Sequence, residues 1–157
     1  MTNINLRFAL YIACALAVSV SQLGCNGGDE WTAKRPKVYR ASGVLKMDGV
    51  PLDEATVVYH SQSHDLAAQG ITDKVGSFTL TTFNNGDGAV EGKHKVVITK
   101  RTYEKKKTKF DSPTEKSEAL IPKDLLPIRY SLSTSTDVEV KVVSKGTNNA
   151  TIEISSK

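Results

Sequence analysis

The chain has 157 residues, in which 21 Lys and Arg stand against 17 Asp and Glu, for a formal net charge of +4. This mild positive balance is far from the profile of a dedicated nucleic-acid-binding protein, and the length suits one domain of ordinary size. Aromatic residues account for only 6% of the chain, so the core has to be built from Val, Ile, Leu and Ala, which suits a β-sheet.

Residues 1–24 are predicted to be a signal peptide. The first seven residues are polar and carry one positive side chain, Arg7, and residues 8–20 contain no charge. This is the outline of a secretory signal, and the apolar run is shorter than the roughly 20 residues that a membrane-spanning helix needs. Cleavage would leave 133 of the 157 residues with a net charge of +3, because the removed part holds one Arg and no acid.

The two cysteines have different fates under this prediction. Cys14 would leave with the signal peptide, so Cys25 would be the sole thiol of an exported protein, without a disulfide partner. The stretch Gln22-Leu23-Gly24-Cys25 resembles a bacterial lipobox, which implies that Cys25 is lipidated and becomes the N-terminus. Gln22 departs from that pattern, which usually has Leu, Val or Ile there. The alternative is cleavage by the ordinary signal peptidase after Gly24, leaving a soluble secreted protein with a free thiol.

Residues 25–37 are small and polar, with a proline near the end, and are predicted to be a lipidated tether. Asn26 follows the cysteine where Asp would favour retention in the inner membrane under enteric-type sorting, so we expect an outer-membrane lipoprotein facing the periplasm or the cell surface.

Residues 38–157 are predicted to form an all-β domain, a seven-stranded antiparallel β-sandwich. Apolar residues alternate with polar ones in short segments separated by Gly, Asn and Asp turns, as in half-buried strands. Residues 145–149 are predicted to form a plain hairpin between the last two strands. The expected strands lie within residues 38–49, 55–61, 67–73, 77–83, 92–100, 136–144 and 149–155. The residues expected to face inward are Ala41, Gly43, Leu45, Ala55, Val57, Tyr59, Phe78, Leu80, Thr82, His94, Val96, Ile98, Val138, Val140, Val142, Ala150, Ile152 and Ile154.

The segment from Lys100 to Tyr130 interrupts this pattern. It is strongly charged at its start and ends near two prolines, and it is predicted to be a long loop, either functional or mobile. A short helix over residues 113–120 is a weakly signalled addition.

Two blocks carry a family resemblance. Residues 43–57 (GVLKMDGVPLDEATV) and 72–80 (TDKVGSFTL) resemble the hallmark blocks of carboxypeptidase-regulatory-like domains, which are transthyretin-type seven-stranded sandwiches. Leu45 and Val75 are mild departures. Residues 81–100 and 125–142 further resemble small planctomycete lipoproteins, with His94 where that group usually has Tyr. The resemblance covers about residues 37–155 and implies an accessory module of the cell envelope.

Gly49 and Gly76 are expected in tight turns that favour positive φ, and Pro51 fixes the backbone conformation of the chain that leaves the first turn.

No enzymatic activity and no cofactor are expected. The transthyretin-type hydrolases of 5-hydroxyisourate end in Tyr-Arg-Gly-Ser, whereas this chain ends in TIEISSK. No G-x-S-x-G motif surrounds any serine, so serine nucleophile chemistry has no support.

Three groups of polar residues are candidates for ligand binding. His60, His64 and Asp65 are weak candidates for a transition-metal site, against two solvated histidines at a strand exit. His94 is expected to be a partly buried packing residue and not a ligand. Asn84, Asn85 and Asp87 resemble an oxygen-rich calcium loop, but an EF-hand-type site needs more carboxylates, so we predict a turn. The third group is basic and is a candidate for contact with an anionic surface, against a solvated loop: Lys100, Arg101, Lys105, Lys106, Lys107 and Lys109.

These observations predict a non-enzymatic, lipid-anchored envelope protein that contacts the membrane through its N-terminal lipid and a protein or glycan through its domain. The alternative is a carrier of a small ligand or metal through the loops of the sandwich. Nucleic acid is not an expected partner.

Overall fold

The structure is a computed structural model, and it describes residue 32 and residues 34–107 and 118–157. The chain divides into two units between Arg35 and Pro36, and the second unit, residues 36–157, holds the fold described below. It is built almost entirely of β-strands, as predicted, and its one 3-10 helix in the described residues is η2, Ile128–Tyr130.

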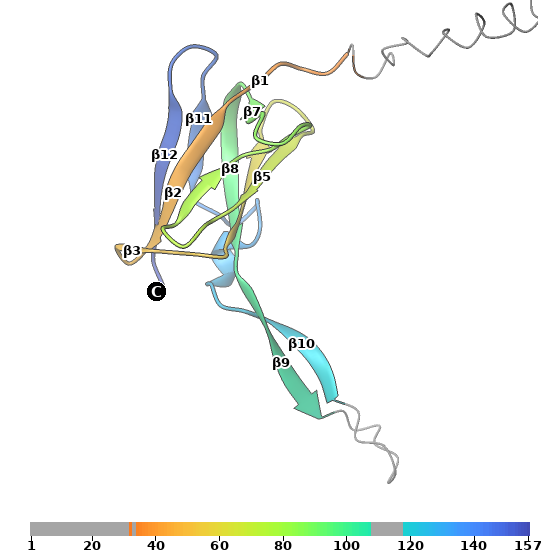
Figure 1. Cartoon of the computed structure of the whole chain (residues 1–157), viewed down its shortest axis with the longest axis vertical. Helices are drawn as coiled ribbons and strands as arrows, with labels where there is room; N and C mark the ends of the chain where they lie inside the picture. Colours follow the sequence, from red (N-terminus) through yellow and green to blue (C-terminus); the bar gives the residue numbers. More distant parts are fainter. Residues whose placement is uncertain (1–31, 33, 108–117) are drawn as a thin grey trace, which may run out of the picture. The chain divides into compact units, whose positions relative to one another are not determined.

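The described strands are numbered in chain order, and η2 lies in the longer connection from β10 to β11 (Figure 1). Their bounds are β1 Val38–Tyr39, β2 Ala41–Met47, β3 Val50–Pro51, β4 Thr56–Ser61, β5 Ala67–Ile71, β6 Ser77–Thr79, β7 Ala89–Val90, β8 Gly92–Thr99, β9 Arg101–Lys107, β10 Glu118–Asp124, β11 Glu139–Val142 and β12 Asn148–Ile154.

Two four-stranded sheets make up most of the described fold. The first has the order β11-β8-β4-β5 and is antiparallel throughout. In the second, β2 pairs with β12 along one edge and with both β3 and β6 along the other. The pair of β2 and β12 is parallel, which departs from the all-antiparallel prediction. Two further two-stranded sheets pair β1 with β7 and β9 with β10.

One apolar core lies between the two sheets and gives the fold its sandwich-like character. Leu45 of β2 and Ile152 of β12 come from one sheet, and Val57 of β4 and Ile98 of β8 come from the other, and all are buried in the same cluster. Burying such a side chain stabilises the folded state by roughly 1.5–3 kcal/mol. The predicted alternation is confirmed in β2, where Ala41, Gly43 and Leu45 are buried and the residues between them are partly exposed.

Two of the predicted turns contain a glycine with a positive φ angle. The turn from β2 to β3 places Asp48 at φ 50° and Gly49 at φ 83°, and two consecutive positive φ angles are the requirement of a type I′ hairpin turn. Gly76 has φ 75° in the turn before β6, where the Asp73 carboxylate accepts hydrogen bonds from the N–H groups of Val75 (3.0 Å) and Ser77 (2.8 Å). The positive φ angles expected for Gly49 and Gly76 are therefore confirmed.

The predicted hairpin between the last two strands is wrong. β11 and β12 lie in different sheets, because β11 pairs with β8 and β12 pairs with β2. The Asn148 side chain bonds to Val143 instead, accepting from its N–H (2.9 Å) and donating to its carbonyl (3.0 Å). Alternating burial shows that a segment is a strand, but it does not reveal which strand pairs with it.

The predicted long loop is also wrong over much of its length. Residues 101–107 and 118–124 form β9 and β10, which pair in antiparallel register from Arg101 with Asp124 to Lys107 with Glu118. The suggested helix over residues 113–120 is contradicted at residues 118–120, which belong to β10, and residues 113–117 lie outside the described residues.

Candidate functional site

The strands β9 and β10 form a two-stranded ribbon, called the ribbon below, that pairs with no other strand in the described part of the chain (Figure 1). β9 follows β8 with only Lys100 between them. At the base of the ribbon, where β9 begins and β10 ends, the N–H of Leu125 donates a hydrogen bond to the carbonyl of Lys100 (2.9 Å). An ion pair between Lys100 Nζ and Asp53 Oδ1 (2.7 Å) ties the same point to the loop before β4 and lowers the pKa of Asp53.

Exposed apolar side chains lie on both faces of the ribbon. Cross-strand neighbours share a face. Tyr103 stands opposite Pro122, and Leu120, two positions along β10, lies on the same face. Tyr103 is 66% exposed and Leu120 is 62% exposed, and Ile121 on the other face is 41% exposed. A two-stranded ribbon is marginally stable in water by itself, and its outer edges present main-chain groups that another strand can pair with.

Among the predicted basic residues, Lys100 and Arg101 are held in ion pairs within the chain. Lys100 binds Asp53, and Arg101 Nε binds Asp124 Oδ1 at 2.8 Å across the ribbon, which raises the pKa of Arg101. Lys105, Lys106 and Lys107 lie on β9, and Lys109 lies outside the described residues. On the other strand, Lys123 Nζ binds Glu104 Oε1 at 2.6 Å. Exposed pairs of this kind connect the two strands of the ribbon but contribute little to stability, about 0–1 kcal/mol.

The weak metal candidates do not gather into a site. His60 is on β4, and His64 and Asp65 are exposed in the following turn, where His64 Nδ1 lies 3.0 Å from Ser63 Oγ. Within residues 34–107 and 118–157 no group of three His, Cys, Asp or Glu is arranged to hold a metal ion.

The predicted turn at Asn84, Asn85 and Asp87 is confirmed, and Asp87 organises it. Its carboxylate accepts hydrogen bonds from the backbone N–H groups of Thr82 (2.8 Å), Phe83 (3.0 Å) and Asn84 (2.8 Å). Partial burial opposes ionisation of this carboxyl, but the N–H groups outweigh it and lower its pKa. Both carboxylate oxygens of Asp87 thus bind the backbone of the turn.

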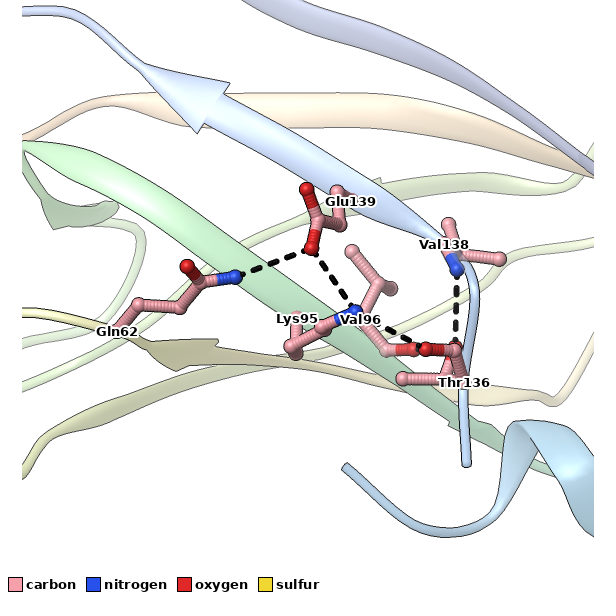
Figure 2. Close-up of polar contacts among 6 residues, drawn as sticks. All are labelled: Gln62, Lys95, Val96, Thr136, Val138 and Glu139. Carbon is pink, nitrogen blue, oxygen red and sulfur yellow. Dashed lines mark hydrogen bonds and ion pairs between the residues drawn. The ribbon is translucent and has the colours of Figure 1, made fainter. Parts of the chain in front are cut away.

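A polar network fastens the edge strand β11 to β8 (Figure 2). Glu139 accepts from Lys95 Nζ (2.9 Å) and from Gln62 Nε2 (3.3 Å), and these contacts, Lys95 first, lower the pKa of Glu139. Beneath it, the Thr136 hydroxyl donates to the Val96 carbonyl (2.8 Å) and accepts from the Val138 N–H (3.2 Å). The network bonds side chains to each other and to the backbone, which is a structural role.

Sequence reasoning missed one buried site. His94 is buried as predicted, with Nε2 2.9 Å from the Val90 carbonyl, and its ring lies beside that of Tyr59 with centroids 5.8 Å apart. Neither His94 Nδ1 nor the Tyr59 hydroxyl has a hydrogen-bond partner within the described residues. Alternation placed both residues in the core, but it carries no information on whether their polar atoms are satisfied.

The predicted lipid-anchor residue, Cys25, and its neighbours lie outside the described residues. No helix in the described part of the chain is long and apolar enough to cross a membrane.

Comparison with known proteins finds no relative: no family model matches the chain, and neither the curated proteins nor the solved structures contain a significant match.

Proposed function

We propose that this protein is a non-enzymatic, lipid-anchored protein of the cell envelope whose β-domain serves as an interaction module. The anchor would be Cys25, as the lipobox-like residues 22–25 and the preceding apolar run suggest. The membrane would be the outer one, with the domain facing the periplasm or the cell surface.

The domain is proposed to be a seven-stranded, transthyretin-type sandwich of the carboxypeptidase-regulatory-like kind. The seven predicted strands correspond to β2, β4, β5, β6, β8, β11 and β12, and the other strands are additions to this set. The two blocks that carry the resemblance touch each other, because the N–H of Leu45 in the first donates to the carbonyl of Gly76 in the second (2.8 Å).

The ribbon is the observation that supports an interaction role most directly. It exposes Tyr103, Leu120 and Ile121, and Tyr and other aromatic side chains are enriched in protein interfaces. Its two edges allow an extended segment of a partner to add as a further strand, which is a recurring mode of recognition. The proposed partner is therefore an envelope protein that pairs with the ribbon.

A non-enzymatic role agrees with the chemistry of the described acidic groups. The carboxylates of Asp48, Asp53, Asp87 and Glu139 have lowered pKa values, and each is bonded to a partner that fixes a turn or joins two elements. None of these pKa values lies near neutrality, where a general acid or base works best.

Site-specific photo-crosslinking in intact source cells tests the proposed contact. A benzophenone amino acid at position 103 is expected to capture one defined envelope protein. The same group at position 75 is the control, because Val75 is 62% exposed and belongs to the turn before β6 and not to the ribbon. Capture at position 103 should disappear when Leu120→Ser is added. The same captured set at both positions, or no capture at position 103, would contradict the proposal.

A further inference from the structure

The two outer edges of the ribbon differ in their main-chain groups. The N–H of Leu125 donates to the carbonyl of Lys100, so these two residues form a hydrogen-bonded pair in the register that continues along β9 and β10. Hydrogen-bonded and non-hydrogen-bonded pairs alternate along an antiparallel ladder. Tyr103 and Pro122, three pairs further on, are therefore a non-hydrogen-bonded pair, and their main-chain groups point outward to opposite edges of the ribbon.

Pro122 makes the β10 edge unsuitable for the addition of a further strand. A proline has no N–H to donate, and a proline on an edge strand is one of the devices that prevent pairing with another chain. The β9 edge contains no proline, and Tyr103 presents both its N–H and its carbonyl there. In the described part of the chain, β9 pairs with β10 alone. The β9 edge is therefore the one at which a third strand can add.

The two strands also differ in charge. The sequence of β9, RTYEKKK, has four basic residues and one acidic residue, whereas that of β10, EALIPKD, has two acidic residues and one basic residue. Arg101 and Lys105 are exposed and lie on the same face of the ribbon as Tyr103, two positions before it and two positions after it. A strand that adds at the β9 edge places its own side chains directly opposite these three residues. Cross-strand pairs of opposite charge are favourable and pairs of like charge are unfavourable, so this edge selects an acidic strand.

A second copy of this chain fits the β9 edge poorly. Pairing of β9 with β9 of another copy would place two basic strands side by side, which is unfavourable. Pairing of β9 with β10 of another copy would use the edge that contains Pro122. Both arrangements are disfavoured, which favours a partner with a different sequence.

We propose that the β9 edge of the ribbon binds an extended acidic segment of another protein as an antiparallel third strand. The segment places a carboxylate opposite Arg101, an apolar side chain opposite Tyr103 and a second carboxylate opposite Lys105. The inference rests on the proposed interaction role and specifies the partner for it. Main-chain hydrogen bonds supply the affinity in this mode of recognition, and the alternate side chains supply the specificity.

Amide hydrogen exchange of the ¹⁵N-labelled full-length protein tests the premise without a ligand. Thr102 and Glu104 belong to hydrogen-bonded pairs of the ribbon, whereas the N–H of Tyr103 points outward. The amide of Tyr103 is therefore expected to exchange several times faster than the amides of both neighbours. If it exchanges as slowly as they do, the edge is already covered, by this chain or by a second copy, and the proposal fails.

Titration with synthetic peptides tests the choice of partner. The peptide acetyl-Thr-Asp-Thr-Val-Thr-Asp-Thr-amide places Asp, Val and Asp on one face, and saturable shifts of the amide signals of Arg101, Tyr103 and Lys105 are expected. The control peptide has Lys in place of both Asp residues. It should bind roughly tenfold more weakly, because two favourable cross-strand pairs become unfavourable. Equal binding of the two peptides, or no saturation with the acidic one, would overturn the proposal.

Two N-methylated forms of the acidic peptide test main-chain pairing at unchanged charge. A methyl group on the Val nitrogen removes the N–H that meets the Tyr103 carbonyl, so this peptide should not bind. A methyl group on the nitrogen of the following Thr lies at the outer edge of the added strand, so this peptide should bind like the parent. Equal affinity of the two methylated peptides would show that charge alone attracts the segment, which contradicts strand addition.

The crosslinking experiment separates failure of this inference from failure of the proposed function. Capture of a protein at position 103 through a segment with alternating acidic residues supports both. Capture through a basic or uncharged segment leaves the interaction role in place and overturns the acidic strand. Absence of capture in cells together with binding of the acidic peptide would contradict the proposed function and retain the β9 edge as a strand-binding surface.

Discussion

Asp87 is the residue on which the turn between β6 and β7 depends. Three backbone N–H groups, those of Thr82, Phe83 and Asn84, converge on its two carboxylate oxygens. Without the carboxylate the N–H groups of Thr82 and Phe83 would lie partly buried and unpaired, a loss that is larger than that of an ordinary surface hydrogen bond.

We therefore expect Asp87→Ala to lower the free energy of unfolding at pH 7 by roughly 2–3 kcal/mol. The pKa of Asp87 is lower in the folded chain than its ordinary value of 3.8. Its contribution is therefore complete above about pH 4 and is lost as the pH falls through the lowered value. The difference between wild type and variant should narrow below pH 4, and urea denaturation at pH 7, 5, 4 and 3 measures it.

Asp65→Ala is the control for this experiment, because Asp65 is an exposed aspartate in another loop. It should leave the free energy of unfolding nearly unchanged at every pH. A constant difference between Asp87→Ala and wild type from pH 7 to 3 would show that the carboxylate charge does not hold the loop.

The sequence predicted most of the buried core residues but few of the hydrogen bonds that their polar atoms make or lack. Residues such as Leu45, Val57 and Ile98 were placed correctly because alternation of apolar and polar residues follows directly from the pleat of a strand. The missing hydrogen bond of the Tyr59 hydroxyl was beyond prediction, because alternation places a side chain on the buried face of a strand but carries no information on the partners of its polar atoms.

The ribbon shows why a whole element escaped prediction. Neither of its faces packs against the core, so Arg101, Tyr103 and Lys105 alternate with Thr102 and Glu104 without any apolar period. Apolar and polar residues alternate along a strand only where one of its faces is buried. A strand that is held by cross-strand pairing alone does not show this alternation in its sequence. The charged sequence was therefore interpreted as a loop, although β10, the strand that pairs with β9, is the next strand along the chain.

We predict that the ribbon can be removed without loss of the fold. The Lys100 carbonyl and the Leu125 N–H are already hydrogen-bonded, so replacing residues 101–124 by Asn-Gly would close a two-residue β-turn with the same bond. No residue of the ribbon belongs to the described core cluster. The shortened full-length chain should keep its β-rich circular dichroism spectrum and unfold within about 5 °C of the wild type, in line with a change of about 1 kcal/mol.

The same deletion with a single Gly as the linker is a useful control, because one residue cannot close this turn and the variant should be clearly less stable. Loss of cooperative unfolding in the Asn-Gly variant would show that the ribbon supports the fold, which would weaken the case for a binding role.

At the scale of the whole molecule, the parallel pairing of β2 with β12 joins the first long strand to the last. Its register runs from Ala41 with Asn148 to Met47 with Ile154. Sequence periodicity identified both strands but paired β12 with its neighbour along the chain, because local patterns favour hairpins and contain no information on contacts across more than 100 residues. The fold class was thus predictable, and the strand order was not.

The proposed anchor makes a prediction about where the protein resides. Cys25 lies in the unit that ends at Arg35, whereas the core lies in residues 36–157. We therefore expect Cys25→Ser to leave the thermal unfolding of the domain unchanged but to move the protein from the membrane fraction to the soluble exported fraction. Each acyl chain contributes about 0.8 kcal/mol per buried methylene group, and several chains are needed for stable anchoring.

Cys14→Ser provides the matched control, because Cys14 lies within the predicted signal peptide and is absent from the processed chain. This variant should fractionate with membranes like the wild type. Mass spectrometry of the mature N-terminal peptide then decides between the two processing routes: a diacylglyceryl mass on Cys25 identifies the lipoprotein. An unmodified peptide that begins at Cys25 shows that the ordinary signal peptidase acted after Gly24, and that Gln22 in the third position before the cysteine prevents recognition as a lipobox.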